Sequence, residues 1–85
     1  MEKLPPVATL TLAVSSYLET LGTKASNSEI DDAVSVALNI PAELLSTIHD
    51  GKRTVFQYKM AWARTNAKKT GRIISLGNAY WKSAN

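Results

Sequence analysis

Basic side chains dominate the last third of this chain, and their chemistry suits the binding of a polyanion. Residues 51–85 contain eight Lys or Arg and no Asp or Glu. All seven acidic residues lie in residues 1–50 together with two Lys, so the first segment carries a formal charge of −5 and the second +8, giving the net +3. A positive surface without carboxylates attracts phosphates, and nucleic acid is the commonest polyanion in a cell. Nucleic acid is therefore the first expected partner.

Catalytic and metal-binding chemistry finds little support in the residue types. The chain has no Cys and a single histidine, His49, so thiolate zinc sites, cysteine nucleophiles and paired imidazole ligands are excluded. The triplet Asp50-Gly51-Lys52 has the acid-x-Lys spacing of a nuclease motif, but it is expected in a loop without a second acid to hold Mg²⁺. Asp31 and Asp32 are neighbours on a predicted helix, where they point apart and are expected to face water. We expect no catalytic site, no metal site and no cofactor.

Length and composition predict one small folded domain over residues 1–85. With 45 % apolar residues, two Trp, three Tyr and one Phe, the chain can build a hydrophobic core. The absence of Cys suits a reducing, cytoplasmic setting. The apolar stretch Val7–Val14 is interrupted by Thr9 and Thr11, so neither a membrane span nor a signal peptide is expected.

Two amphipathic helices are predicted in the first half of the chain. The Pro5-Pro6 pair can begin a helix that ends at Gly22. A polar connection at residues 23–28 follows, and a capping box of Ser26 and Glu29 predicts the start of the second helix. Their apolar residues recur at helical spacing: Val7, Leu10, Val14, Leu18 and Leu21 in the first helix, and Ile30, Ala33, Val34, Ala37 and Leu38 in the second.

The second half contains the helix with the strongest signals. Pro41 breaks the preceding pattern and can begin a short helical turn, which a polar loop at residues 49–53 follows. The Thr54–Gln57 capping box predicts a helix over residues 54–70 that ends before Gly71. The expected core face of this helix carries Val55, Phe56, Met60, Trp62, Ala63 and Ala67, and the expected free stripe carries Gln57, Ala61, Arg64 and Lys68.

A β-hairpin is predicted over residues 72–82, because β-branched and aromatic residues flank a Gly77-Asn78 turn. The fold class is therefore mainly α with a small β-hairpin, in which three main helices precede a C-terminal wing. This is the winged helix-turn-helix plan. In that plan the third long helix enters the major groove of DNA, and the wing lies against the backbone.

Several residues of the second half also match a known family. They are Val55, Phe56, Lys59, Trp62-Ala63 and Lys68-Lys69 between Gly51 and Gly71, followed by Trp81. This pattern resembles the N-terminal domain of Mrr-type restriction endonucleases. The resemblance implies a winged helix that presents double-stranded DNA, often modified, to a separate C-terminal nuclease of the PD-(D/E)XK kind. No such nuclease is expected within these residues, so the chain would be a domain of a longer endonuclease or a standalone reader.

The sequence departs from the family pattern at Ala67, at Arg72 and at Asn78-Ala79, which concerns the contacts of the wing more than the fold. Arg64 is expected to contact a base and Lys68 a phosphate, because Arg binds guanine through two hydrogen bonds. The expected DNA-binding residues are Lys52, Arg53, Thr54, Gln57, Arg64, Lys68, Lys69, Arg72, Asn78 and Lys82.

Two other functions remain open at this point. A winged helix can serve as a protein-interaction or dimerisation module, and Leu12, which projects off the core face of the first helix, would line such an interface. Specific RNA binding needs exposed stacking aromatics, whereas Trp62 and Trp81 are expected to pack in the core. We therefore expect double-stranded DNA, modified or unmodified, as the partner. A C-terminal nuclease domain or a second copy are further partners, and no membrane is expected.

Overall fold

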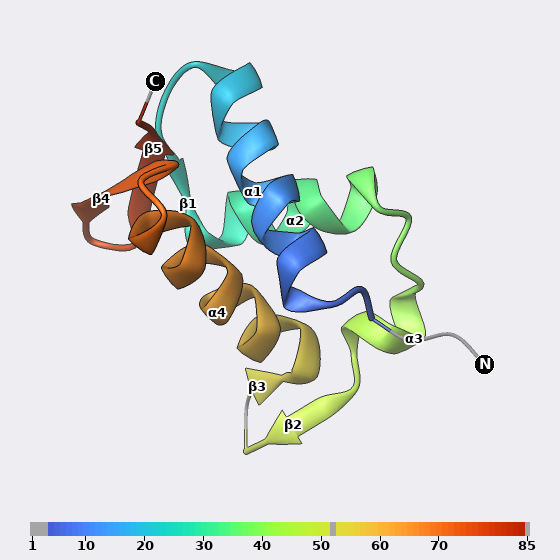
Figure 1. Ribbon diagram of the computed structural model, residues 1–85. Helices are drawn as coiled ribbons and strands as arrows, with labels where there is room; N and C mark the ends of the chain where they lie inside the picture. The colour runs from blue at the N-terminus through green and yellow to red at the C-terminus, as the bar shows by residue number, and fades with distance from the viewer. Residues whose placement is uncertain (1–3, 52, 85) are drawn as a thin grey trace.

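Three long helices make up the body of the molecule, shown in Figure 1 as a computed structural model that describes residues 4–51 and 53–84. Helix α1 spans Val7–Leu21, α2 spans Asn27–Ala37 and α4 spans Val55–Lys69. A one-turn helix, α3 (Ala42–Leu45), lies between α2 and α4 in the chain. None of the helices in the described ranges has the length and apolar content needed to cross a membrane.

The strands form two small antiparallel sheets. In the first sheet, β5 (Tyr80–Ser83) lies between β4 (Ile73–Gly77) and β1 (Ala25–Ser26). In the second sheet, β2 (Ile48–Asp50) pairs with β3 (Arg53–Thr54). The β4–β5 pair is the predicted hairpin. Three main helices followed by this hairpin form a winged helix-turn-helix arrangement, so the predicted fold class is confirmed.

The core lies where α1, α2 and α4 meet. α1 packs chiefly against α4 and next against α2. Because an apolar residue recurs at every third or fourth position, each helix buries one face, and each large apolar side chain that is fully buried stabilises the fold by roughly 2 kcal/mol. The buried cluster consists of Leu10, Val14, Leu18, Ala25, Ile30, Val34, Ile40, Phe56, Met60, Ala63, Ala67 and Ile73.

The predicted helix ends are confirmed by their hydrogen bonds. The Glu29 N–H donates to Ser26 Oγ at 3.2 Å, and the Ser26 N–H donates to Glu29 Oε1 at 3.1 Å. Thr54 and Gln57 form the same reciprocal pair at the start of α4, with both distances 3.0 Å. Gly71 follows the end of α4 with a φ of 76°, a left-handed conformation that suits glycine. α4 therefore lies within the expected range 54–70.

Two segments expected to be irregular contain short strands instead. The polar connection at residues 23–28 includes β1, in which Ala25 pairs with Trp81 and Ser26 pairs with Tyr80. Within the expected loop, residues 49–50 lie in β2 and Arg53 lies in β3, and these two strands pair with each other. A strand of two or three residues has no periodicity of its own, and the partner of β1 lies at the other end of the chain. The sequence pattern therefore gave no signal for either pairing.

Trp81 fixes the hairpin to the helical body. Its half-buried ring packs against the core, and its Nε1–H donates to Asn27 Oδ1 at 2.6 Å. Nearby, Lys24 Nζ lies 4.9 Å from the centroid of the Tyr80 ring, a cation–π contact. The expectation that Trp81 packs in the fold is confirmed, and these contacts join the wing to the start of α2.

Candidate nucleic-acid interface

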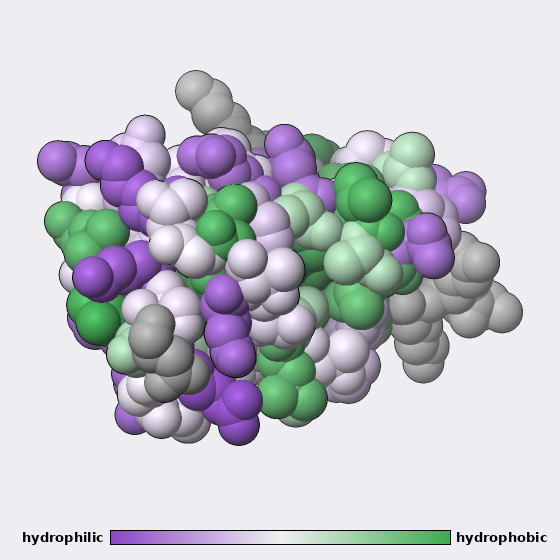
Figure 2. Space-filling model, turned by 90° about the horizontal axis from the view of Figure 1, so that it is seen from above, coloured by the Kyte–Doolittle hydropathy of each residue, from purple (hydrophilic) through white to green (hydrophobic). Residues whose placement is uncertain are grey.

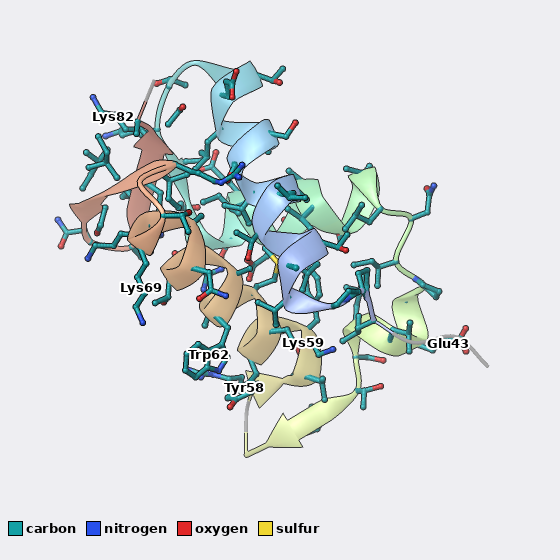
Figure 3. All side chains as sticks on the ribbon, viewed as in Figure 1. Glu43, Tyr58, Lys59, Trp62, Lys69 and Lys82 are labelled. Carbon is teal, nitrogen blue, oxygen red and sulfur yellow. The ribbon has the colours of Figure 1, made fainter. Side chains whose placement is uncertain are left out.

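Helix α4 turns one face toward the core and the opposite face outward. Phe56, Met60, Ala63, Arg64 and Ala67 are buried. At about 100° per residue, the positions opposite this buried face are Tyr58, Trp62, Thr65 and Lys69, and we call these four residues the outward face of α4. Figure 3 shows Tyr58, Trp62 and Lys69 extending from α4 away from α1 and α2.

Trp62 belongs to this outward face, where 48 % of its surface is exposed. The expectation that it packs in the core is therefore wrong. Phe56, Met60 and Ala63 already fill the side of α4 that meets the core, and Trp62 lies roughly 130° around the helix from the centre of that side. Grouping Trp62 with the core residues made the predicted apolar face too broad.

Arg64 occupies a different environment from the one its position on the predicted free stripe suggests. It is 7 % exposed, and its Nη1–H donates to Asp31 Oδ1 of α2 at 2.5 Å. The expectation that Asp31 faces water is wrong, and Arg64 of the stretch without Asp or Glu pairs with an acid from the first half of the chain. Their side chains lie on different helices, and the charge pattern along the chain does not reveal which helices pack together. Arg64 is thus held by α2, which argues against its expected role as the base reader.

The surroundings of the Asp31 carboxyl group change its pKa. Burial raises its pKa from the ordinary value of 3.8 to about 6. The charge of Arg64 and the hydrogen bond from Arg64 oppose that rise, and the neighbouring charge of Asp32 adds to it. Desolvation therefore outweighs pairing, so the ion pair is fully formed only above about pH 6.

The capping box limits what Thr54 and Gln57 can offer a ligand. Thr54 Oγ1 accepts the Gln57 N–H, and Gln57 Oε1 accepts the Thr54 N–H. A bidentate contact with adenine needs both the oxygen and the nitrogen of a glutamine amide. Since the oxygen is engaged at the start of α4, Gln57 retains its amide N–H groups as donors.

Three of the expected DNA-binding residues meet in one hollow beside α2. Its lining is polar and comes from two helices and the segment before α4: Arg53, Gln57, Ala61 and Arg64 on one side, and Asn27, Ser28 and Asp31 on the other. The predicted free stripe of α4 therefore borders α2. The side of α4 that faces outward lies next to this stripe and is the outward face defined above.

Five expected DNA-binding cations are exposed, and none of them forms an ion pair with any described residue: Arg53, Lys68, Lys69, Arg72 and Lys82. Asn78 is exposed in the turn between β4 and β5, with a φ of 53°. Lys52 lies outside the described residues. In Figure 3, Lys69 and Lys82 extend from the end of the molecule that carries the hairpin, whereas Glu43 lies on α3 at the opposite end. These two cations and this acid therefore lie at different ends of the molecule, whereas Arg64 lies against Asp31.

The surface carries small apolar areas among these charges. Figure 2 shows hydrophobic areas separated by hydrophilic side chains on the face seen from above. A shallow hollow of about 360 Å³ on the outward side of α4 is lined by Arg53, Tyr58, Ala61, Trp62 and Thr65. Across the described ranges, no three His, Asp or Glu side chains lie close enough together to hold a metal ion.

Comparison with protein families gives a match over nearly the whole chain. The family described as the Mrr N-terminal domain matches residues 9–83. The chain belongs to this family. Membership suggests that this Mrr N-terminal domain is part of a restriction-system protein, and the match covers no catalytic domain. Searches among curated proteins and among solved structures found no match.

The outward face of this Mrr N-terminal domain contains residues that sequence reasoning did not assign to a site. The sequence pattern predicts Trp62 in the core and assigns no role to Tyr58 or Thr65. A narrower core face, centred on Phe56, Met60 and Ala67 in the helical projection, would have excluded Trp62. No signal in the sequence could have found the Arg64–Asp31 pair, because it depends on how α2 crosses α4.

Proposed function

We propose that this domain binds double-stranded DNA, with α4 in the major groove and the β4–β5 hairpin against the sugar–phosphate backbone. One observation carries the proposal. The exposed cations of α4 and the hairpin have no carboxylate partner within the described residues, in a winged helix-turn-helix arrangement. Such cations release condensed counterions when they meet phosphates, which drives binding to a duplex.

The charge distribution favours a nucleic acid over a small anion. Arg53 precedes the N-terminus of α4, Lys68 and Lys69 lie at its C-terminus, and Lys82 lies on β5. These positions span the length of α4 and the adjacent hairpin, as the backbone of a duplex does when a helix occupies its major groove. Family membership in a restriction-system domain agrees with a DNA substrate.

The test is a fluorescence-anisotropy titration with duplexes of about 20 base pairs, unmodified or methylated at adenine or cytosine, at two salt concentrations. With three to six phosphate contacts, the logarithm of the affinity should fall with the logarithm of salt with a slope of about −3 to −5. A single-stranded oligonucleotide of the same sequence is the control. Absence of duplex binding at low salt would rule the proposal out, and tighter binding to a methylated duplex would define the modification that is read.

A second candidate function is a protein-interaction or dimerisation module, which one exposed residue favours. Leu12 of α1 is 56 % exposed, as predicted, and lines a groove with Asn66 and Thr70 of the α4 end and with the cations Lys69 and Arg72. Small-angle scattering over a concentration series distinguishes the two functions. A dimer that Leu12→Glu abolishes would support this candidate, and a monomer at all concentrations would exclude the homodimer.

A further inference from the structure

The outward face of α4 is apolar at its centre and positive at its ends. Trp62 lies in the middle of the helix and is about half exposed, and Tyr58, one turn earlier, is 37 % exposed. Arg53 lies before the N-terminus and Lys69 lies at the last residue of α4. A large exposed aromatic surface in a small domain is the kind of feature that marks a binding site. The flanking cations indicate that its partner is anionic.

Most polar groups near this face that could read a base edge are engaged, and Gln57 beside it retains only its amide N–H donors. The Arg64 guanidinium binds Asp31, and the Gln57 amide oxygen is part of the cap. The Thr65 hydroxyl donates to the Ala61 carbonyl at 3.0 Å, within the helix. The surface that remains at the centre of the outward face is therefore mostly hydrocarbon and aromatic ring. Such a surface recognises an apolar group better than a hydrogen-bonding edge.

Among the four unmodified bases, the major groove offers one apolar group, which is the methyl group on C5 of thymine. The modified base 5-methylcytosine carries the same group at the same position, whereas the other base edges in this groove are donors or acceptors. Apolar side chains discriminate thymine by contacting this methyl group. The indole ring of Trp62 provides a broad apolar surface for such a contact, with Ala61 and Thr65 beside it in the hollow.

We propose that Trp62 is a specificity-determining residue that contacts pyrimidine C5-methyl groups in the major groove. This inference rests on the proposed binding of duplex DNA through α4. Burial of one methyl group is worth about 0.8 kcal/mol, which is about a fourfold change in affinity. Arg53 and Lys69 hold the backbone on either side, and Trp62 supplies the discrimination.

The test uses four pools of duplexes that share a randomised central segment of about 12 base pairs, enough for a helix and its flanking contacts. Each pool contains either thymidine or deoxyuridine, combined with either deoxycytidine or 5-methyldeoxycytidine. Two pools form a pair when they differ in only one of these nucleotides. Replacing thymine by uracil removes the C5-methyl group and keeps every hydrogen-bonding atom. The full chain is titrated with each pool in competition format, and the ratio of affinities within each pair is the readout. We expect a ratio of about four in favour of the methyl-bearing pool.

Variants separate the role of Trp62 from that of the fold. Trp62→Ala should bring the ratio to one and leave the salt dependence unchanged, and Trp62→Phe should keep most of the ratio. The matched control is Val36→Ala, an exposed apolar residue of α2 that is 75 % exposed. It should leave both quantities unchanged. Circular dichroism of each variant verifies that the fold is intact.

Each outcome has a defined meaning. A preference confined to the thymine pair, or to the 5-methylcytosine pair, supports the inference and identifies the source of the methyl group. Salt-dependent binding with ratios of one in both pairs overturns it and leaves the proposed function standing. A preference that persists in Trp62→Ala overturns the assignment to Trp62. Absence of binding to any pool at low salt overturns the proposed function itself.

Discussion

Arg64 and Asp31 lie on different helices and form an ion pair that is mostly removed from solvent, with 9 % and 16 % of their side-chain surfaces exposed. A pair of this kind costs desolvation energy that its attraction only partly repays, so its presence is weak evidence for stability. It ties α2 to α4 in a defined relative position. The pair also makes the contact between α2 and α4 depend on pH, because burial raises the pKa of Asp31 to about 6.

The Asp31 carboxyl group should titrate with a midpoint near pH 6, as followed by the ¹³C shift of its side-chain carboxyl carbon. The folded state then binds more protons than the unfolded state between the ordinary pKa of 3.8 and about 6. The contribution of Asp31 to the free energy of unfolding is therefore greatest below about pH 4 and is lost as the pH rises through 6. Asp31→Asn assigns the signal. A midpoint near 4 would mean that desolvation of the carboxyl group does not outweigh its pairing with Arg64.

Arg64→Met should destabilise the domain by about 3 kcal/mol at pH 7.5, because it leaves the Asp31 carboxylate buried without a partner. Urea unfolding measures this loss. At pH 5, where Asp31 is largely protonated, the loss should be smaller, and adding Asp31→Leu should recover much of it at pH 7.5. Lys68→Met, an exposed position on the same helix, is the control. An equal loss at both pH values would assign the effect to packing of the Arg64 side chain.

The wing turn is the element with the clearest local strain. Asn78 and Ala79 connect β4 to β5 with φ values of 53° and 63°. Two consecutive positive φ values are typical of a type I′ turn, which twists the strands correctly but favours Asn followed by Gly. Asn78 suits its position, whereas the Cβ of Ala79 opposes a left-handed conformation. The turn is therefore held by the pairing on either side of it.

Ala79→Gly should stabilise the domain by about 1 kcal/mol, because glycine adopts a left-handed conformation without steric cost. The midpoint of thermal unfolding should rise by about 5 °C, measured by circular dichroism. Ala8→Gly in the exposed part of α1 is the matched control, and it should lower the midpoint because glycine weakens a helix. A lower midpoint for Ala79→Gly would indicate that the turn differs from the type I′ geometry.

The elements that could be predicted from the sequence are those specified by near neighbours. The Ser26–Glu29 and Thr54–Gln57 boxes are each contained within four residues, so both helix starts were correct. The β2–β3 hairpin was missed because its strands are too short to show periodicity, and the other misses depend on partners far along the chain. β1 exists because β5 lies beside it, and the position of Trp62 depends on how much of α4 the other helices cover. Periodicity assigns a face to a helix, but tertiary packing sets the width of that face.

At the scale of the whole molecule, the net charge of +3 conceals an uneven distribution, with −5 in residues 1–50 and +8 in residues 51–85. Glu43 lies at the α3 end, and Lys69 lies where α4 approaches the hairpin (Figure 3). Long-range attraction would respond to the total charge, whereas contact with phosphates responds to the position of each charge. The proposed function requires that binding depend on the position of each charge.

Two single substitutions distinguish these behaviours. Lys69→Gln lowers the net charge from +3 to +2 and should reduce the salt slope of duplex binding by about 0.9, the value for one phosphate contact. Glu43→Gln raises the net charge from +3 to +4 and should leave the slope unchanged. Anisotropy titrations at four or more salt concentrations measure the salt slope of each variant. Equal and opposite effects of the two variants would show that total charge governs binding.

The pairing of β1 with β5 also has a consequence for the time at which the domain becomes folded during synthesis. Ala25 is fully buried and its strand partner is Trp81, so the edge of β1 stays open until the last strand has left the ribosome. The helices precede β5 in the chain, and they can form turns and meet one another before that moment. A nascent chain that stops before Tyr80 should therefore remain susceptible to proteolysis between α1 and α2. The domain should acquire resistance in one late step.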